Sequence, residues 1–521
     1  MSERTAVVIG AGIAGLAAAG LLSREGHRVT VLEARAETGG RAGTWERDGF
    51  RFDTGPSWYL MPEVFEHFFR LMGTDAETEL DLVPLAPAYR VYAEGRGDPL
   101  DVAAGRAATA LFERVEPGAG ARLESYLESA REAYELAAGR FLYDTYASAS
   151  GLLDPALLRR LPRLLPLLAR PLASHVRRRF ADERLRQILG YPAVFLGSSP
   201  YRAPSLYHLM SHLDLAEGVR YPMGGFGTVT AAVERLATAA GARIETDAPV
   251  ARILTANGAA RGVRLADGRE LAADLVVSTA DLHHTETALL GEGERTYPES
   301  WWRRRGPGPG ALLVMLGVRG ALPQLAHHTL LFTEDWRENF DAIFGRAPRI
   351  PRPASMYVCR PSATDPSTSP PGHENLFVLV PVPADPAMGR GGVDRGGDPA
   401  VEAAADLAIA QLSRWCGIDD LAERVVVRRT AAPGDFAADL RAWRGGALGL
   451  EHTLLQSAMF RPGNASRKVA GLMYAGGSVL PGIGLPMCLI SAELVVKRLR
   501  GDRSAGPIAE PPRTEAAGGR R

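Results

Sequence analysis

The chain has 521 residues, which is too long for one ordinary hydrophobic core and predicts about two to four domains. Apolar residues make up 46% and charged residues 23% of it, as in an average globular protein. The 60 basic and 60 acidic side chains cancel, so no overall field attracts nucleic acid, and no nucleic-acid partner is expected. Three scattered cysteines fit no disulfide or metal spacing, which predicts a reduced, cytoplasmic compartment.

The N-terminus and the hydropathy pattern bear on membranes. Residues 1–4 lead straight into an apolar run, without the basic region and cleavage site of a signal peptide. No stretch of 18 or more residues is apolar, so no bilayer-spanning segment is expected. We therefore expect a soluble protein, or one that lies on the surface of a membrane.

The first forty residues carry a dinucleotide-binding pattern. An apolar run meets Gly10-Ala11-Gly12-Ile13-Ala14-Gly15, a helical pattern follows, and a second apolar run at 29–32 ends at Glu33. This is the strand, glycine turn, helix, strand and acid order of a Rossmann unit. The glycines permit a sharp turn and a close approach to a pyrophosphate, whose charge the helix N-terminus favours. Glu33 is placed to accept a hydrogen bond from a ribose 2′-hydroxyl and would repel a 2′-phosphate, which disfavours NADP.

The continuation of this pattern favours FAD over NAD. Ala34 leads to Glu37-Thr38-Gly39-Gly40-Arg41, where a glycine pair lets the backbone reach the pyrophosphate and the flavin side. Arg41 offers a charged donor fork. The pattern therefore predicts FAD as the cofactor.

The remaining pattern predicts a nucleotide-binding domain interrupted by long insertions. Short strand candidates at 243–246, 249–254 and 261–265 precede an apolar run at 275–279, which we expect to rejoin the first sheet. The fold class expected is α/β, with a parallel sheet in a discontinuous Rossmann-like domain. The expected ranges are 1–80, 222–290 and 465–500 for the FAD-binding domain, 81–106 and 291–464 for a mixed α+β substrate-binding domain, 107–221 for a helical, membrane-facing subdomain, and 501–521 for a disordered tail.

A second glycine-rich turn lies near the C-terminus. A strand pattern at 472–474 meets Gly476-Gly477-Ser478, and Pro481-Gly482-Ile483-Gly484 follows before a long helical pattern. A helix N-terminus directed at the same cofactor would offer its dipole to a flavin that carries negative charge when reduced. The turn therefore predicts the second half of the cofactor site.

These motifs together resemble the FAD-dependent carotenoid desaturases of bacterial type, within the amine-oxidase-like flavoprotein superfamily, and are most similar to phytoene desaturase. The strings that carry the resemblance are V-V-I-G-A-G-I-A-G-L, L-E-A-R-x-x-x-G-G-R, F-D-T-G-P-S, Q-S-A-M-F-R-P and G-G-S-x-x-P-G-x-G-x-P. The chain departs from the family signature at Val479-Leu480, where a small polar residue and a His or Gln are usual.

The resemblance implies a substrate, a chemistry and a set of cofactor contacts. The substrate class is a lipophilic C40 polyene such as phytoene, desaturated toward lycopene by hydride transfer to flavin, with a quinone or oxygen reoxidising the cofactor. The expected cofactor-binding residues are Gly10, Gly12, Ile13, Ala14, Gly15, Glu33, Ala34, Gly39, Gly40, Arg41, Gly55, Val250, Gly476, Gly477, Ser478 and Gly484. The alternatives are a 3,4-desaturase or ketolase-like enzyme, an amine oxidase, or a non-redox lipid-binding escort protein of the same fold.

A leucine stripe predicts contact with a membrane. Leu157, Leu161, Leu164, Leu165, Leu168 and Leu172 fall on one helical face, and Arg159, Arg163 and Arg170 fall opposite. Leucines backed by arginines suit a helix that lies on anionic headgroups, while the prolines in the segment argue against one straight helix. We expect a peripheral protein at the inner face of the membrane, unless this stripe packs in the core.

The sequence names neither a catalytic residue nor a metal site. The pairs His283-His284 and His327-His328 are too short and isolated to indicate metal ligands. No general base stands out by motif, so the catalytic residues are left unassigned.

Overall fold

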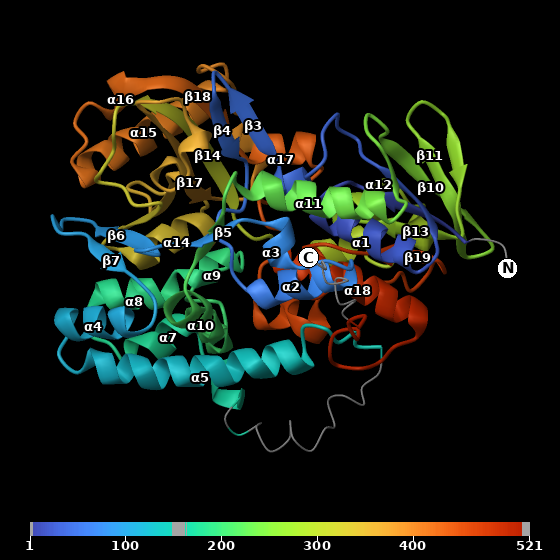
Figure 1. Ribbon diagram of the computed structural model, residues 1–521, viewed down its shortest axis with the longest axis horizontal. Coiled ribbons are helices and arrows are strands. Elements are labelled where there is room, and N and C mark those ends of the chain that lie inside the picture. The colour runs from blue at the N-terminus through green and yellow to red at the C-terminus, as the bar shows by residue number, and fades with distance from the viewer. Residues whose placement is uncertain (1–3, 148–161, 163, 513–521) are drawn as a thin grey trace, which may run out of the picture.

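The structure is a computed structural model, which describes residues 4–147, 162 and 164–512. Two sheets dominate these residues: a parallel sheet on one side of the molecule and a larger mixed sheet on the other (Figure 1). Helices cover both sheets, and the longest of them, α5 (Ala119–Arg140), runs along one edge of the molecule.

The parallel sheet brings together three distant stretches of the chain. Its strand order is β19-β13-β1-β2-β9, and every neighbouring pair is parallel. The strands are β1 (Thr5–Ile9), β2 (Arg28–Leu32), β9 (Arg243–Glu245), β13 (Leu275–Ser278) and β19 (Leu472–Tyr474). Ala6 pairs with Leu275, so the prediction that the apolar run at 275–279 rejoins the first sheet is confirmed.

Helices pack closely on this sheet because their contact faces carry small residues. α1 (Ile13–Arg24) has the sequence IAGLAAAGLLSR and packs against α11 (Phe226–Ala239) and α18 (Leu485–Arg500). A Cβ on Gly20 would lie 3.3 Å from the Cα of Ala237. Burial of both faces of β1 and of nearly all of α1 makes this region the main core of the molecule.

An antiparallel three-stranded sheet extends the same region. It consists of β10 (Val250–Ala256), β11 (Ala259–Leu265) and β12 (Glu270–Ala272). Asn257 and Gly258 both have left-handed φ angles, +54° and +72°, as the tight hairpin turn between β10 and β11 requires. The strands expected at 249–254 and 261–265 are confirmed.

The second large sheet has seven strands in the order β18-β14-β17-β16-β15-β6-β7. The strands are β6 (Tyr89–Ala93), β7 (Leu100–Val102), β14 (Gly310–Arg319), β15 (His328–Phe332), β16 (Met356–Cys359), β17 (His373–Val382) and β18 (Val425–Ala431). All of them fall within 81–106 and 291–464. Two ribbons complete the strands: β3 (Thr44–Arg47) with β4 (Phe50–Asp53), and β5 (Leu82–Pro84) with β8 (Arg220–Pro222).

The remaining α-helices fall into two groups. Between residues 106 and 212 lie α4 (Arg106–Val115), α5, α7 (Leu172–Arg177), α8 (Glu183–Gly190), α9 (Pro192–Phe195) and α10 (Met210–His212). The others are α2 (Pro62–Leu71), α3 (Ala76–Glu79), α12 (Leu282–Ala288), α13 (Glu299–Trp302), α14 (Trp336–Phe344), α15 (Pro399–Cys416), α16 (Leu421–Arg424) and α17 (Pro433–Asp439). Among the described helices, none combines the length and the apolar character needed to cross a bilayer.

The leucine stripe does not form one membrane-facing surface over its described part. Leu172 is fully buried in the core beneath the seven-stranded sheet. Leu164 and Leu168 line an internal cavity, and Leu165 is the exposed member. The chain bends at Arg170 before α7 begins, as the neighbouring proline favours. The members at 157, 159, 161 and 163 lie outside the described residues.

Residues 501–512, the first part of the tail that we expected to be disordered, pack against α18. Within 501–512, Ile508 is buried, and its N–H donates to the carboxylate of Glu493. The ammonium group of Lys497 donates to the carbonyl oxygen of Ser504 at 2.7 Å. These backbone contacts to buried side chains of α18 order a segment whose composition predicted disorder. Residues 513–521 lie outside the described residues.

Candidate functional site

One cavity of about 2260 Å³ connects the parallel sheet with the seven-stranded sheet. Fifteen of the predicted cofactor residues line it: Gly10, Gly12, Ile13, Ala14, Glu33, Ala34, Gly39, Gly40, Arg41, Gly55, Val250, Gly476, Gly477, Ser478 and Gly484. The glycine-rich loops thus meet at one end of the cavity although some 450 residues separate them in sequence.

The sixteenth residue, Gly15, faces the sheet. A Cβ on Gly15 would lie 1.9 Å from the carbonyl oxygen of Gly10, so only glycine lets α1 pack this closely. Gly12 differs, because a Cβ there would meet nothing nearer than the carbonyl oxygen of Gly39 at 3.9 Å. Gly15 therefore shapes the turn, and Gly12 leaves free space at the N-terminus of α1.

The loops around Gly12, Gly39 and Gly55 pack on one another through their backbones. The N–H of Gly39 donates to the carbonyl oxygen of Ala11 at 2.9 Å, and Gly39 has a left-handed φ of +99°. A Cβ on Gly55 would lie 2.0 Å from the carbonyl oxygen of Arg41. Side chains at these positions would separate the loops, and their absence leaves a polar backbone surface facing the cavity.

The carboxylate of Glu33 is held in place by the backbone. Its two oxygens accept hydrogen bonds from the N–H groups of Ala11, at 2.7 Å, and Arg35, at 3.0 Å. Glu33 itself is buried. An ionised carboxylate offers about four acceptor positions, so the oxygens retain capacity for the hydroxyl groups of a ribose.

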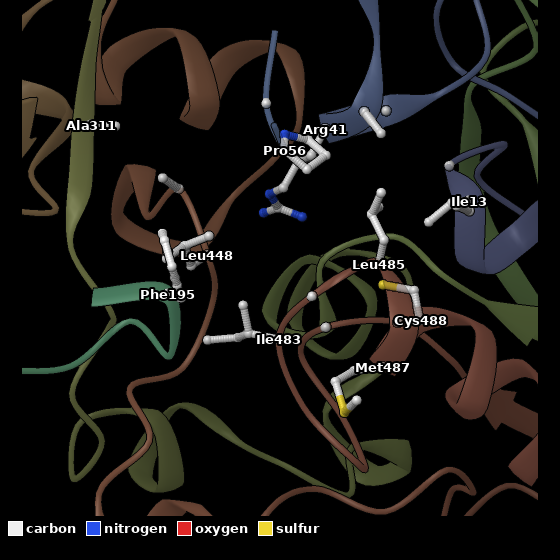
Figure 2. A pocket seen from close by; sticks show the side chains of 18 of the residues that line it. Ile13, Arg41, Pro56, Phe195, Ala311, Leu448, Ile483, Leu485, Met487 and Cys488 are labelled. Atoms are coloured by element: carbon white, nitrogen blue, oxygen red, sulfur yellow. The ribbon is translucent and has the colours of Figure 1, made fainter. Parts of the chain in front are cut away.

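The second glycine-rich loop leads into α18, whose N-cap is Gly484. The hydroxyl of Ser491 in α18 holds the backbone of this loop in place. It accepts a hydrogen bond from the N–H of Gly476 at 2.9 Å and donates one to the carbonyl oxygen of Leu480 at 2.7 Å. Figure 2 shows Leu485 and Cys488 of α18 across the cavity from Ile13 of α1. Two helix N-termini, each favourable to negative charge, therefore face the same space.

Sequence reasoning missed Arg461 as a support of this loop. The guanidinium is buried and donates to the carbonyl oxygens of Val479, at 3.1 Å, and Gly477, at 2.5 Å. Burial lowers the pKa of Arg461 to about 10, so it stays charged at neutral pH. The available signal was its place in the string Q-S-A-M-F-R-P, which carried the family resemblance.

Arg41 extends toward the middle of the cavity. In Figure 2 its guanidinium lies below Pro56 and faces the region between Ile483 and Leu485. One of its nitrogens is 4.0 Å from the carboxylate of Asp281. A positive charge is therefore available where the glycine-rich end gives way to apolar walls.

The other end of the cavity is apolar. Its lining draws on the helical region, the seven-stranded sheet and the C-terminal loops, and includes Leu164, Leu168, Phe195, Leu209, Met210, Leu313, Met315, Phe332, Phe340, Phe377, Leu448 and Ile483. No sequence pattern predicted this arm, because its residues have the composition of an ordinary hydrophobic core. Phe195, Leu448 and Ile483 lie together beside Arg41 (Figure 2).

An imidazole lies in the wall near these residues. His452 lines the cavity, and its Nδ1 is 2.9 Å from the carbonyl oxygen of Leu196. A carbonyl can only accept, so Nδ1 carries the proton and Nε2 keeps its lone pair. Burial lowers the pKa of His452 to about 3, which keeps the ring neutral at pH 7.

Cys488 lines the cavity in the first turn of α18, where a reactive thiol would be placed to attach a flavin covalently. Burial raises the pKa of its thiol to about 11. The thiol is therefore protonated at neutral pH and is a poor nucleophile.

Residues 13–500 match the family described as flavin-containing amine oxidoreductases. The chain belongs to this family. Among its relatives, a carotenoid 3,4-desaturase of Haloarcula japonica is 40% identical over 503 residues, which cover 96% of this chain and 99% of that protein. A zeta-carotene-forming phytoene desaturase of Myxococcus xanthus is 38% identical over 515 residues, covering 99% and 97%. An oxidoreductase from Methanosarcina mazei has the same fold, with a TM-score of 0.61 and 18% identity over 95% of this chain and all of that one.

As a flavin-containing amine oxidoreductase, the chain is an FAD-dependent oxidoreductase with an α/β flavoprotein fold. Its glycine-rich end suits the adenine dinucleotide of FAD, because the space beside Gly12 is open and the carboxylate of Glu33 is presented to it. The resemblance to bacterial carotenoid desaturases is likewise confirmed.

Proposed function

We propose that this enzyme desaturates a long acyclic carotenoid precursor, with FAD as the hydride acceptor. The observation that carries the proposal is the single cavity of about 2260 Å³, which joins a polar glycine-rich end to a long apolar arm. Pockets for one small ligand usually enclose about 300–1,000 Å³, so this cavity has room for a dinucleotide and a polyene together. The relatives named as carotenoid desaturases support the same reaction class.

The proposed cofactor contacts follow the glycine-rich end. The N-terminus of α1, at Gly12, would hold the pyrophosphate, and Glu33 would accept from the ribose. Arg41 and the N-terminus of α18 would face the flavin portion. When bound, FAD supplies the acceptor for a hydride.

The apolar arm would hold the polyene and keep water away from the reacting carbons. Desaturation removes a hydride from one carbon and a proton from its neighbour, and an allylic position favours it because the developing positive charge spreads into the adjacent double bond. Phe195, Leu448 and Ile483 would hold that segment of the chain in position. The arm thus selects for length and flexibility rather than for polar groups.

We assign the proton-accepting role to His452. Its Nε2 has a lone pair, and the ring is fixed by the bond from Nδ1 to Leu196. A weak base is sufficient here, because a proton next to a developing allylic cation is strongly acidic. The leaving proton would pass to Nε2, and a neutral alkene would remain in the arm.

A membrane surface is the proposed source of substrate. Exposed apolar side chains lie at the rim of the cavity or next to it: Leu454, Met459 and Phe460 line the cavity, and Leu165 and Leu455 adjoin the lining residues Leu164 and Leu454 in the chain. Tyr207 of the helical region donates to the hydroxyl of Ser457 at 2.8 Å, which ties the two sides of the rim together. Large exposed apolar residues around an opening suit partial insertion into lipid. A peripheral position at the inner face of the membrane would also give the cofactor access to a quinone, with oxygen as the alternative acceptor.

Expression in cells that accumulate phytoene tests the proposal. Pigments are extracted and separated by chromatography, with the Gly12→Asp variant as a matched inactive control. New, more unsaturated carotenes are expected only with the unaltered enzyme, and their double bonds count the desaturation steps. Unchanged phytoene together with a flavin that no carotene reduces would overturn the proposal and favour a non-redox escort protein.

A second candidate, 3,4-desaturation, is favoured by the 40% identity to the relative named for that reaction. It is tested in the same cells by supplying an acyclic carotene such as lycopene in place of phytoene. A product from lycopene but none from phytoene would assign the enzyme to 3,4-desaturation.

A further inference from the structure

Three side chains that could coordinate a metal ion, those of His327, His328 and Cys359, lie close together outside the large cavity. His328 begins β15 and Cys359 ends β16, and the antiparallel ladder pairs these two residues directly. His327 precedes the strand. The possible ligand atoms of the three residues lie within 4.8 Å of one another, and all three residues are buried.

Each imidazole in this cluster is already oriented through its Nδ1. The Nδ1 of His327 is 2.7 Å from the hydroxyl of Thr364, and that of His328 is 2.8 Å from the hydroxyl of Tyr357. Neither Nε2 has a hydrogen-bond partner among the described residues, although both are buried. Histidine ligands of metals are held in this way, with one nitrogen fixed by a neighbouring polar group and the other free to coordinate. A buried nitrogen without any partner would otherwise be costly.

We propose that His327, His328 and Cys359 bind one Zn²⁺ ion through the two Nε2 atoms and the sulfur. Zinc takes imidazole and thiolate ligands at about 2.0–2.3 Å, so the side chains need to draw together by only a few tenths of an ångström to about one ångström. Binding converts the thiol of Cys359 to a thiolate and releases its proton to solvent.

The surroundings provide for a fourth position. A cavity of about 10 Å³ lies beside Cys359 and is also lined by Asp53 and Tyr221. This is about the space that one water needs, and the hydroxyl of Tyr221 has no hydrogen-bond partner among the described residues. A water there would bond to Tyr221 and approach the ion from the side of Cys359, since neither histidine lines this small cavity.

The proposed site would support the wall of the cavity. The ring of His328 stacks on that of Trp58, with 4.6 Å between centroids and 11° between planes. The hydroxyl of Tyr357, which holds His328, is also 2.6 Å from that of Ser57. Ser57, Trp58 and Tyr357 all line the cavity, so the ion would fix three wall residues without touching a ligand inside.

Metal content tests the proposal independently of enzyme activity. The full-length protein is produced in zinc-supplemented medium, passed over a gel-filtration column and analysed for metal. About one zinc per chain is expected, and protein produced with Co²⁺ should show a thiolate-to-cobalt charge-transfer band in the near ultraviolet. Fewer than about one ion per ten chains, with no rise in the unfolding midpoint on adding zinc, would overturn it.

Two cysteine variants locate the ion. Cys359→Ser should lose the metal and the charge-transfer band, and Cys416→Ser is the matched control, because Cys416 is also buried but lies in another core cluster. Equal metal in both variants would place any ion elsewhere and refute the site. If Cys359→Ser fails to fold, the thiolate-to-cobalt charge-transfer band of the unaltered protein tests the site, because this band requires a coordinated thiolate. A cobalt-loaded protein without the band would refute the site.

Discussion

The two ends of the cavity are built in opposite ways. The glycine-rich end is made of backbone, with loops at 10–15, 39–41 and 476–484 brought together by one parallel sheet. The apolar arm is made of side chains from the helical region and the seven-stranded sheet. In the function proposed above, the first end would recognise the cofactor through fixed N–H groups and helix N-termini, and the second would exclude water from a flexible substrate chain. Substitutions should therefore act through geometry at one end and through size and polarity at the other.

The largest effect is expected from Gly12→Asp at the glycine-rich end. A carboxylate in the open space beside Gly12 would fill the position of the pyrophosphate and repel its charge. We expect FAD affinity to fall by at least about 1,000-fold, or about 4 kcal/mol, as measured by flavin absorbance after desalting. Gly97→Asp is the control, because Gly97 has open space and is exposed. Normal flavin content in Gly12→Asp would contradict the assignment of this end.

His452→Gln should give the next largest effect, in the arm. Glutamine keeps a polar group of similar size but cannot take up a proton, so kcat should fall by about 100-fold while flavin content is unchanged. His284→Gln serves as the control, because His284 also lines the cavity. Turnover within twofold of the unaltered enzyme would remove His452 from the mechanism.

Gly15→Ala separates packing from binding within the glycine-rich end. The added methyl group would overlap the carbonyl of Gly10, which should lower the free energy of unfolding by about 2–3 kcal/mol. Gly12→Ala, with open space around the new Cβ, should weaken flavin binding with little change in the stability of the apoprotein. Chemical denaturation of both apoproteins makes the comparison, and equal stabilities would refute the distinction.

Sequence patterns predicted the glycine-rich end and missed the arm for a physical reason. A turn that needs a left-handed φ or a close approach, as at Gly10 or Gly39, leaves a mark at one position in the chain. A cavity wall leaves none, because Leu448 facing a cavity and a leucine in a core have the same composition around them. The docking of 501–512 was missed similarly, since its partners Lys497 and Glu493 lie on a different element. The fold class, and the return of the 275–279 run to the first sheet, could be predicted from local apolar runs. The side-chain contacts between distant segments could not be predicted in this way.

A smaller effect is expected at the outer end of the arm. Leu455→Ser combined with Phe460→Ser removes two exposed apolar groups from the rim and should weaken binding to anionic lipid vesicles by about fivefold to tenfold. Leu407→Ser with Val426→Ser is the matched control, because both are exposed on elements of the seven-stranded sheet region. Co-sedimentation with vesicles measures the effect, and equal losses in the two double variants would argue against a membrane-facing rim.

The smallest effect concerns pH and the support of α18. His67 lies between the carboxylates of Glu493, at 3.1 Å, and Glu510, at 3.0 Å. Burial opposes the charged ring, but the hydrogen bonds and charges of these two carboxylates outweigh it and raise the pKa of His67. Stability from the charged form is therefore complete below about pH 6.5 and is lost as pH rises through the higher folded pKa. We expect the free energy of unfolding of the unaltered protein to fall by less than about 1 kcal/mol by pH 9, and that of His67→Gln not to show this fall. Thermal unfolding across this pH range measures the effect, and the same pH slope in both proteins would contradict it.

The position of β19 in the parallel sheet means that the sheet cannot be completed until late in synthesis. β19 covers the outer edge of β13, yet the chain must grow from Ser278 to Leu472 before this strand exists. At about 5–20 residues per second, that takes roughly 10–40 s. Throughout this interval the apolar strand β13 has an unpaired edge in an incompletely folded nucleotide-binding domain, and such exposed edges promote aggregation. A chain that has not been synthesised beyond Gly484 lacks the second glycine-rich loop, so flavin uptake would report that synthesis has passed this point.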